Sequence, residues 1–165
     1  MDRLTIRPAA EGDAQTILAV HRAAVLQTAA SAYGPDILDA WAAGSDPDSV
    51  RKMGRIIASQ AELALVVEEA EVVVGFGSIV PALEELRAIY VHPHHGRRGI
   101  GARILEALQQ LARGHQMQVL RMDASLNAEG FYRRHGFVAI GHGEHALRNN
   151  ARMACIKMEK TLLPG

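Results

Sequence analysis

The sequence contains a single cysteine, Cys155, among its 165 residues, so an internal disulfide bond is excluded. It has no excess of charge, because eighteen lysines and arginines balance eighteen aspartates and glutamates. This balance argues against a protein that binds nucleic acid over its whole surface. The longest strongly apolar run, residues 72–83, is too short and too interrupted by glycine to cross a bilayer. No cationic leader opens the chain, so we expect a cytoplasmic protein that binds neither nucleic acid nor a membrane.

Apolar residues are abundant enough for one substantial core. They make up 48% of the chain, and a chain of 165 residues is typical of a single domain. The sequence contains no internal repeat and no low-complexity linker. We therefore expect one domain over residues 1–165.

The apolar periodicity predicts a mixed α+β fold. Strands are predicted at residues 4–7, 63–67, 72–80, 85–91, 119–123, 137–141 and 154–158. A long helix is predicted after Asp13, two short ones beginning at Pro35 and Pro47, and two more over residues 100–113 and 128–135. The second, third and fourth strands form an antiparallel meander. Because a helix connects the fourth strand to the fifth, these two should run parallel.

Residues 86–105 predict a binding site for a phosphate group. A strand-like run ends in Tyr-Val-His-Pro at residues 90–93, and Gly-Arg-Arg-Gly-Ile-Gly follows at residues 96–101 before the helix. The first turn of a helix has unpaired N–H groups and a partial positive charge, and glycine lets the main chain approach a phosphate closely. No acidic residue occurs between Glu85 and Glu106, so the local charge is also suitable for an anion.

Two other phosphate-binding patterns fit this stretch less well. A P-loop requires Gly-Lys-Ser/Thr after a four-residue spacing, which is missing. A dinucleotide fingerprint requires a third glycine or alanine where Ile104 stands, although Asp123 lies at about the expected distance for an acid that binds ribose. The predicted order also has too few β-α-β units for a doubly wound domain. Nucleotide binding through the same loop remains a rival interpretation.

The glycine-rich stretch resembles the acetyl-CoA-binding motif of the GNAT superfamily of N-acetyltransferases. That motif is Gln/Arg-x-x-Gly-x-Gly/Ala, and here Gly96 takes its first position, which removes one side-chain contact. Arg97 or Arg98 can supply the lost charge. Residues 127–137 match a second GNAT segment in full, Asn-x-x-x-Phe-Tyr-x-x-x-Gly-Phe. The resemblance by sequence covers residues 75–137, and before that it rests on element order.

The resemblance implies a GNAT fold, an α+β mixed and mostly antiparallel central sheet flanked by helices in the order β-α-α-β-β-β-α-β-α-β-β. It implies a single N-acetyltransferase domain over residues 1–165, with acetyl-CoA as cosubstrate and no metal. The loop would surround the pyrophosphate, Asn127 would steady the pantetheine, and strand amides would bind the thioester oxygen. The cofactor-binding residues that it implies are Ile89, Tyr90, Val91, Arg97, Arg98, Gly99, Ile100, Gly101, Ala102, Asn127 and Tyr132.

Two residues are candidates for the chemistry, Tyr132 and Glu85. By resemblance, Tyr132 directs its hydroxyl at the sulfur of coenzyme A, where a phenol with a pKa near 10 can protonate or hydrogen-bond a thiolate whose thiol has a pKa of about 8.5. Glu85 would remove a proton from the acceptor ammonium. Regular alternation places Glu85 on the face of Ile89 and Val91, but a bulge would change that. The alternatives, a core tyrosine and a solvated strand-end glutamate, remain open.

A covalent acyl-enzyme is not expected. Cys155 lies in a late apolar strand, where a small buried residue is commoner than a nucleophile, and no serine fits Gly-x-Ser-x-Gly. We therefore expect direct attack by a primary amine in a ternary complex. The histidines at positions 92, 94 and 95 are expected in an exposed loop rather than around zinc. His142 and His145 have no partner that the sequence identifies.

The acceptor amine is not readable from any motif. Residues 145–158 contain basic groups and no acids, which favours a small molecule or an amino acid that carries a carboxylate. The resemblance also makes a homodimer an assembly to test. The alternative function is a non-catalytic acyl-CoA-binding module of the same fold, in which Tyr132 and Glu85 do no chemistry.

Overall fold

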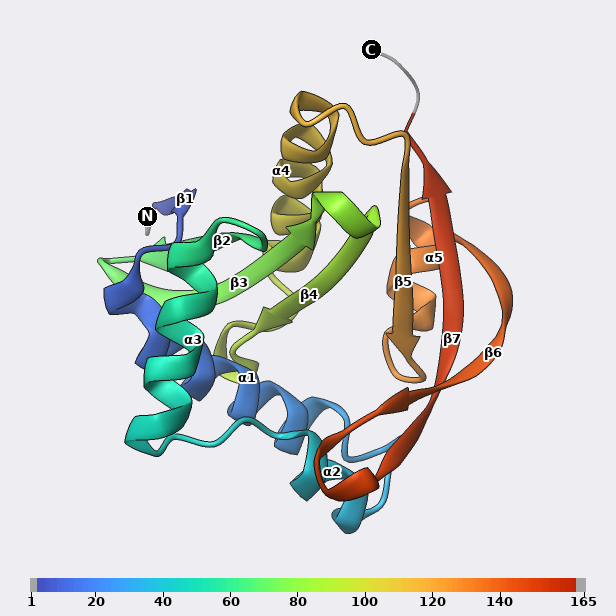
Figure 1. Cartoon of the computed structure of the whole chain (residues 1–165), viewed down its shortest axis with the longest axis horizontal. Coiled ribbons are helices and arrows are strands. Elements are labelled where there is room, and N and C mark those ends of the chain that lie inside the picture. The colour runs from blue at the N-terminus through green and yellow to red at the C-terminus, as the bar shows by residue number, and fades with distance from the viewer. Residues whose placement is uncertain (1–2, 163–165) are drawn as a thin grey trace.

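A seven-stranded sheet forms the centre of the computed structural model, which describes residues 3–162 (Figure 1). Its strands are β1 (Leu4–Pro8), β2 (Leu63–Glu69), β3 (Val72–Val80), β4 (Glu85–Val91), β5 (Val119–Ser125), β6 (Val138–Ala146) and β7 (Arg152–Thr161). They lie in the order β1-β2-β3-β4-β5-β7-β6, and only β4 and β5 run parallel. The predicted mixed, mostly antiparallel α+β fold is confirmed.

Helices flank this sheet on both faces. They are α1 (Ala14–Thr28), α2 (Pro35–Trp41), α3 (Pro47–Ser59), α4 (Ile100–Gly114) and α5 (Glu129–Arg134). Three of them connect β1 to β2, where the expected order counted two. Pro35 and Pro47 are first helical residues, as predicted, because proline lacks the N–H that this position cannot pair. Asp46 caps α3 by accepting hydrogen bonds from Ser49 N at 3.1 Å and Ser49 Oγ at 2.7 Å.

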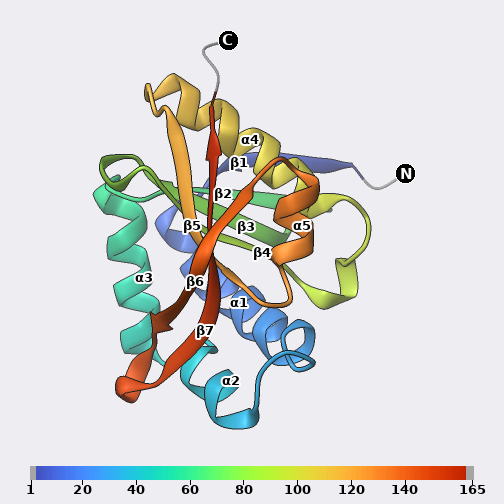
Figure 2. The ribbon, with the colours of Figure 1, turned by 90° about the vertical axis from the view of Figure 1, so that its right-hand side faces the viewer.

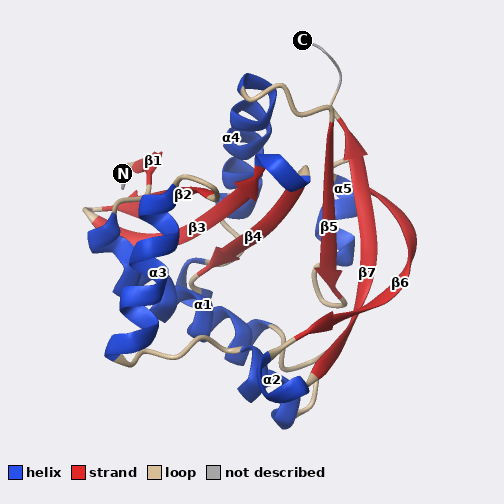
Figure 3. Cartoon of the chain, in the orientation of Figure 1, coloured by secondary structure: helices blue, strands red, loops and turns tan. Residues whose placement is uncertain are grey.

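The two faces of the sheet have separate apolar cores. Helix α4 buries Ile104, Leu105 and Leu108 completely in the larger core. Helices α1 and α3 cover the opposite face, where Ile17 and Ile57 pack against the sheet. Figures 1 and 3 show α4 on the far side of β3 and β4 from α1 and α3. The sheet therefore holds β4 between two packed layers, so its position is fixed from both sides.

Glycine on β3 allows α4 to approach the sheet closely. A Cβ atom on Gly77 would lie 2.7 Å from Ile104 Cγ2, 2.8 Å from the main-chain oxygen of Ala88 and 2.9 Å from Leu108 Cδ1. Real Cβ atoms do not make such contacts, so only glycine fits without a shift. This close approach fixes the distance between α4 and the sheet, and therefore the position of the helix N-terminus relative to β4.

Strands β4 and β5 separate soon after they meet. Glu85 and Arg121 are their one pair in register, and the remainder of β4 has no partner on that side within the described chain. Figure 3 shows the two strands diverging from this point. A bulge adds to the distortion, because Ser78 pairs with Ala88 and Ile79 pairs with Leu86, which leaves Arg87 unpaired. The result is an exposed main-chain edge along β4.

The last hairpin is longer than predicted. Strands β6 and β7 pair from residue 138 to residue 159, whereas the apolar pattern predicted short runs at residues 137–141 and 154–158. The end of this hairpin reaches α2, as Figure 2 shows. Arg148 fastens it there by donating hydrogen bonds to the main-chain oxygens of Asp39, Ala40 and Ala42, at 2.9, 3.1 and 2.6 Å. The extension brings His145 of β6 to the space between β4 and β5.

Candidate active site

The glycine-rich loop leads into the N-terminus of α4, as the sequence predicted. Gly99 precedes the first helical residue with a φ of +75°, and Arg97 has a φ of +61°. These left-handed conformations turn the chain so that α4 starts directly after the loop. The hydrogen bond to Gly99, the residue before the helix, comes from the main-chain N–H of Arg103, at 3.1 Å. The preceding amides in a helix have no intrahelical acceptor, so this end of a 15-residue helix is suited to an anion.

The two arginines of the loop differ in their surroundings. Arg98 forms two hydrogen bonds of 2.8 Å with the carboxylate of Glu69 at the end of β2, and His95 Nδ1 lies 3.0 Å from the same carboxylate. The Arg98 hydrogen bonds lower the pKa of Glu69, which therefore stays ionised at neutral pH. Arg97 instead lines a cavity beside the loop. The structure thus gives Arg98 an anchoring contact and leaves Arg97 facing the space for a ligand.

A cavity of about 540 Å³ lies between the loop, α1, β4 and α5. Seven of the predicted cofactor residues line it: Ile89, Tyr90, Val91, Arg97, Gly101, Asn127 and Tyr132. The other four, Arg98, Gly99, Ile100 and Ala102, belong to the loop and the first helical turn but do not line the cavity. The Ile100 side chain is 1% exposed and packs in the larger core.

The unpaired edge of β4 forms one wall of this cavity. His92 donates its main-chain N–H to Val74 at 2.8 Å, and Tyr90 pairs with Phe76. Because successive N–H groups of a strand point to opposite sides, those of Ile89 and Val91 point away from β3. They face the space that β5 leaves. This edge can pair with an extended ligand, as a neighbouring strand would.

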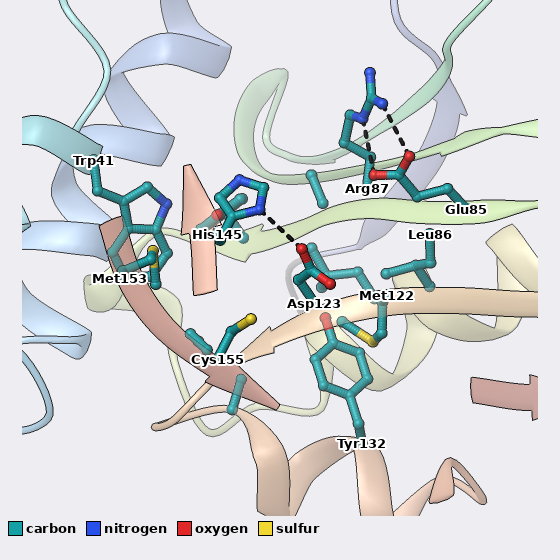
Figure 4. Close-up of a pocket in the computed structure, with 15 residues that line it drawn as sticks. Trp41, Glu85, Leu86, Arg87, Met122, Asp123, Tyr132, His145, Met153 and Cys155 are labelled. Atoms are coloured by element: carbon teal, nitrogen blue, oxygen red, sulfur yellow. Dashed lines mark hydrogen bonds and ion pairs between the residues drawn. The ribbon is translucent and has the colours of Figure 1, made fainter. Parts of the chain in front are cut away.

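A second cavity of about 330 Å³ lies on the other side of Tyr132 (Figure 4). The two cavities share six lining residues: Trp41, Ile89, Tyr90, Ser125, Ala128 and Tyr132. Tyr132 is 5% exposed and projects from α5, with its hydroxyl directed into the second cavity. Burial raises the pKa of Tyr132, so the phenol keeps its proton at neutral pH and remains a hydrogen-bond donor. A donor therefore stands where the two spaces meet.

Glu85 lines the second cavity but lies on a different face of β4 from the one that regular alternation predicts. The bulge at Arg87 reverses the alternation, so that Leu86, Ile89 and Val91 all pack on the α4 side. Glu85 therefore does not share a face with Ile89 and Val91. Both of its carboxylate oxygens accept hydrogen bonds from Arg87, at 3.2 and 2.9 Å. Figure 4 shows this pair at one end of the cavity.

The sequence did not identify a polar cluster on the opposite wall. Asp123 on β5 accepts a hydrogen bond of 2.6 Å from Lys157 on β7, and its other oxygen lies 3.0 Å from Nδ1 of His145 on β6. Burial tends to raise the pKa of Asp123, but the bonds from Lys157 and His145 outweigh it and the pKa is lowered. Asp123 pairs with Lys157, and His145 pairs with Met153 four residues earlier on β7, so the register places the three side chains on one face of the sheet without placing His145 directly opposite Asp123.

Aromatic side chains form the remaining wall, which the sequence also did not identify. The rings of Trp41 and Tyr90 lie 6.3 Å apart, edge to face, and His21 packs 4.5 Å from Tyr90. Burial raises the pKa of Tyr90 to about 12 and lowers that of His21 to about 4, so both are neutral at physiological pH. Trp41 ends α2, and nothing in its local sequence indicates that this short helix faces β4.

Cys155 is buried, and the loop histidines contact one another and Glu69. Cys155 is 1% exposed, and burial raises the pKa of its thiol, which disfavours a thiolate nucleophile. In the loop, His92 accepts a hydrogen bond from the main chain of His94, and His95 contacts Glu69. Among residues 3–162, no group of three or more histidine, cysteine, aspartate or glutamate side chains is arranged to hold a metal ion. None of the helices in that range has the length and apolarity needed to span a membrane.

Known proteins resemble this chain in sequence and in fold. The family described as Acetyltransferase (GNAT) domain matches residues 29–162. The uncharacterized N-acetyltransferase YafP of Escherichia coli K12 is 29% identical over 140 residues, which are 85% of each chain. Both matches include the loop, β4, β5 and α5.

Solved structures share the fold over nearly the whole chain. A GCN5-related N-acetyltransferase described as an aminotransferase, class II, from Rhodopseudomonas palustris has 30% sequence identity and a TM-score of 0.88, with 98% of each chain covered. The PaiA N-acetyltransferase of Thermoplasma acidophilum, solved in complex with coenzyme A, has 21% identity and a TM-score of 0.77, over 96% of this chain and 99% of that one. The acetyltransferase yncA of Salmonella typhimurium, solved with acetyl-CoA, has 22% identity and a TM-score of 0.70, over 98% and 95%. The chain belongs to the GNAT family of acetyltransferases and is an acyltransferase enzyme.

Proposed function

We propose that the protein transfers the acetyl group of acetyl-CoA to a small primary amine by direct attack in a ternary complex. The observation that carries the proposal is the meeting of two cavities at Tyr132, one beside the glycine-rich loop and one beyond it. Such a junction lets a donor and an acceptor enter from opposite sides and react between them. Two of the structural relatives, PaiA and yncA, were solved with coenzyme A and acetyl-CoA, which supports the choice of donor.

The larger cavity has the features that coenzyme A requires. The N-terminus of α4 and Arg97 present donors and positive charge for the diphosphate, and Gly101 carries no side chain that would fill the space. The amides of Ile89 and Val91 offer hydrogen bonds to the pantetheine and the thioester oxygen. Asn127 lines the same cavity near Tyr132. These groups place the sulfur end of the donor at the junction.

Tyr132 then assists the departure of the thiolate. Attack by the amine on the thioester carbon forms a C–N bond and breaks the C–S bond, which leaves a charge on sulfur. The buried phenol donates a hydrogen bond to that sulfur as the charge develops. Burial of the site disfavours the free thiolate as well, so protonation completes the step.

The second cavity is the proposed acceptor site. Its volume of about 330 Å³ is at the lower end of the range for small-molecule sites, which favours a small molecule or an amino acid. Two basic residues of the last hairpin are already bound within the protein, because Arg148 donates to main-chain oxygens and Lys157 donates to Asp123. The arginine that lines the second cavity is Arg87.

The test is a thiol-release assay with acetyl-CoA and a panel of primary amines, with mass spectrometry of the product. We expect at least one small amine to be acetylated, and we expect Tyr132→Phe to lower kcat by about 10²-fold while the Kd for CoA changes less than about threefold. Binding of CoA without turnover by any amine would instead favour the acyl-CoA-binding module.

Thermal unfolding separates nucleotide binding from coenzyme A binding. CoA at 100 times its Kd should stabilise the protein by about 2.7 kcal/mol, and NAD or ATP at the same concentration should not. Stabilisation by NAD or ATP but not by CoA would contradict the proposal.

A further inference from the structure

The hydrogen-bonded pair of Asp123 and His145 supplies a proton acceptor at the wall of the proposed acceptor site. Nδ1 of His145 lies 3.0 Å from Oδ2 of Asp123, and both residues line the 330 Å³ cavity with Tyr132. Figure 4 shows the imidazole and the carboxylate next to each other, between Trp41 and Met153 on one side and the Glu85–Arg87 pair on the other. On the basis of the proposed function, we infer that His145 is the general base that deprotonates the acceptor amine and that Asp123 positions it.

The fold holds this pair in place across a third strand. Asp123 is on β5 and His145 is on β6, and β7 lies between them in the sheet. Lys157 on β7 occupies the other oxygen of Asp123 at 2.6 Å, so one Asp123 oxygen is left for the imidazole. The end of the hairpin is tied to α2 through Arg148, which fixes the strand that carries His145. Two contacts therefore hold the imidazole in place. Asp123 on β5 binds its Nδ1, and Arg148 anchors the hairpin that carries His145.

The hydrogen bond determines which nitrogen accepts a proton. An ionised carboxylate can only accept, so Nδ1 carries the hydrogen in this pair and Nε2 keeps its lone pair. The side chain of His145 is 50% exposed, which allows Nε2 to contact a ligand and later to release a proton to solvent. The negative charge of Asp123 stabilises the imidazolium that forms.

Glu85 is held in an ion pair with a guanidinium. Both of its oxygens already accept hydrogen bonds from Arg87, which is also 3.3 Å from Glu62. Protonation of Glu85 would weaken these ion pairs, whereas protonation of His145 strengthens its contact with Asp123. The charged and titratable groups that line the cavity with His145 are Glu85, Arg87, Tyr90, Asp123, Tyr132 and Cys155, with Lys157 bound to Asp123. Among these, the carboxylate of Asp123 is the one in direct contact with the imidazole.

The proton balance of the reaction is complete with these groups. The acceptor enters as an ammonium ion, and Nε2 of His145 takes one of its protons. The free amine attacks the thioester carbon, the C–N bond forms, the C–S bond breaks, and the sulfur receives the proton of Tyr132. Tyr132 regains a proton from the nitrogen of the new amide, and the imidazolium releases its proton to water. The products are the acetamide, CoA and one proton.

The assignment is tested by the pH dependence of kcat/KM, measured with an amine that wild type acetylates. The four variants are His145→Gln, Asp123→Asn, Glu85→Gln and His142→Gln. His145→Gln should lower kcat by about 10²-fold or more and remove the acidic limb of the profile, with the Kd for CoA unchanged within about twofold. Asp123→Asn should lower kcat by a smaller factor than His145→Gln, because the imidazole is still present but loses the carboxylate that holds its Nδ1. If His145 only shaped the cavity, His145→Gln would raise KM and would leave the acidic limb of the pH profile in place. The matched control is His142→Gln, an exposed histidine on the same strand, which should behave as wild type.

The outcomes separate this inference from the proposed function. If wild type acetylates an amine and His145→Gln keeps both its rate and its acidic limb, the inference is wrong and the proposed function stands. The same holds if Glu85→Gln removes the limb while His145→Gln retains it. Wild type that transfers no acetyl group to any amine would overturn both. Unfolding temperatures of all variants within about 3 °C of wild type would show that the effects are not caused by loss of the fold.

Discussion

Arg98 of the glycine-rich loop and Glu69 at the end of β2 form a two-point ion pair, with Nη1 2.8 Å from Oε2 and Nη2 2.8 Å from Oε1. The carboxylate is 7% exposed, and His95 contacts it as well. The pair ties the loop to the sheet, and neither residue lines the larger cavity. We therefore expect Arg97, which lines that cavity, to supply the charge that the Gln/Arg of the motif would provide.

Arg97→Ala should weaken CoA binding by about tenfold and should reduce the dependence of the Kd on salt, because one charge contact with the diphosphate is lost. Its unfolding temperature should match that of wild type. Arg98→Ala should instead lower the unfolding temperature, because it leaves the buried carboxylate of Glu69 with less compensation. Isothermal titration calorimetry at two salt concentrations, together with thermal unfolding, measures both effects. Arg97→Ala with wild-type affinity and salt dependence would refute the assignment.

Stability should depend on pH through Glu69. The hydrogen bonds from Arg98 lower its pKa in the folded protein, so Glu69 stabilises the fold when ionised. That contribution is fully present above the ordinary glutamate pKa of about 4.3 and is lost as pH falls through the lower folded value. The difference in unfolding free energy between wild type and Glu69→Gln should be constant near neutral pH and shrink below about pH 4. A difference that grows on acidification would contradict this.

Gly77→Ala should destabilise the protein by about 1–3 kcal/mol, because the new methyl group would overlap Ile104, Leu108 and the main chain of Ala88. The matched control is Gly54→Ala in α3, where a Cβ atom would meet no heavy atom within 4 Å. That change should stabilise the helix by about 0.5–1 kcal/mol. Urea denaturation measures both. Equal stability of the two variants would show that α4 can move away from β3 without cost.

Cys155→Ala should retain kcat within about twofold, because direct transfer needs no acyl-enzyme. The buried thiol borders the acceptor cavity, so this variant is a direct test of the alternative covalent route. Intact-protein mass spectrometry during turnover should show no acetylated wild-type protein. An acetylated species that is absent from Cys155→Ala, together with a large loss of rate, would require a covalent mechanism.

Features encoded over short stretches were predictable from the sequence. The loop, the start of α4 and the position of Tyr132 on α5 depend on glycines, helix termini and the spacing of a few neighbours. The parallel pair of β4 and β5 followed from the helix between them. These features needed no knowledge of which distant strands would meet.

Features that depend on long-range register were not predictable. Regular alternation placed Glu85 on the wrong face of β4, because the bulge at Arg87 arises from pairing with β3. The Asp123–His145 contact needs β7 to lie between β5 and β6 and the hairpin to extend to residue 146. The sequence around residues 141–146 is glycine-rich and polar, so its apolar pattern ends before the strand does.

The most direct test of the account is the affinity for CoA of Gly101→Val, measured by isothermal titration calorimetry beside Gly114→Val at the other end of α4. Gly101 lines the larger cavity at the first turn of the helix, whereas a Cβ atom at Gly114 would meet nothing within 4 Å. We predict that Gly101→Val folds and binds CoA about 10²-fold more weakly than wild type, and that the Kd of Gly114→Val stays within about twofold of wild type. Wild-type affinity in a folded Gly101→Val protein would contradict it.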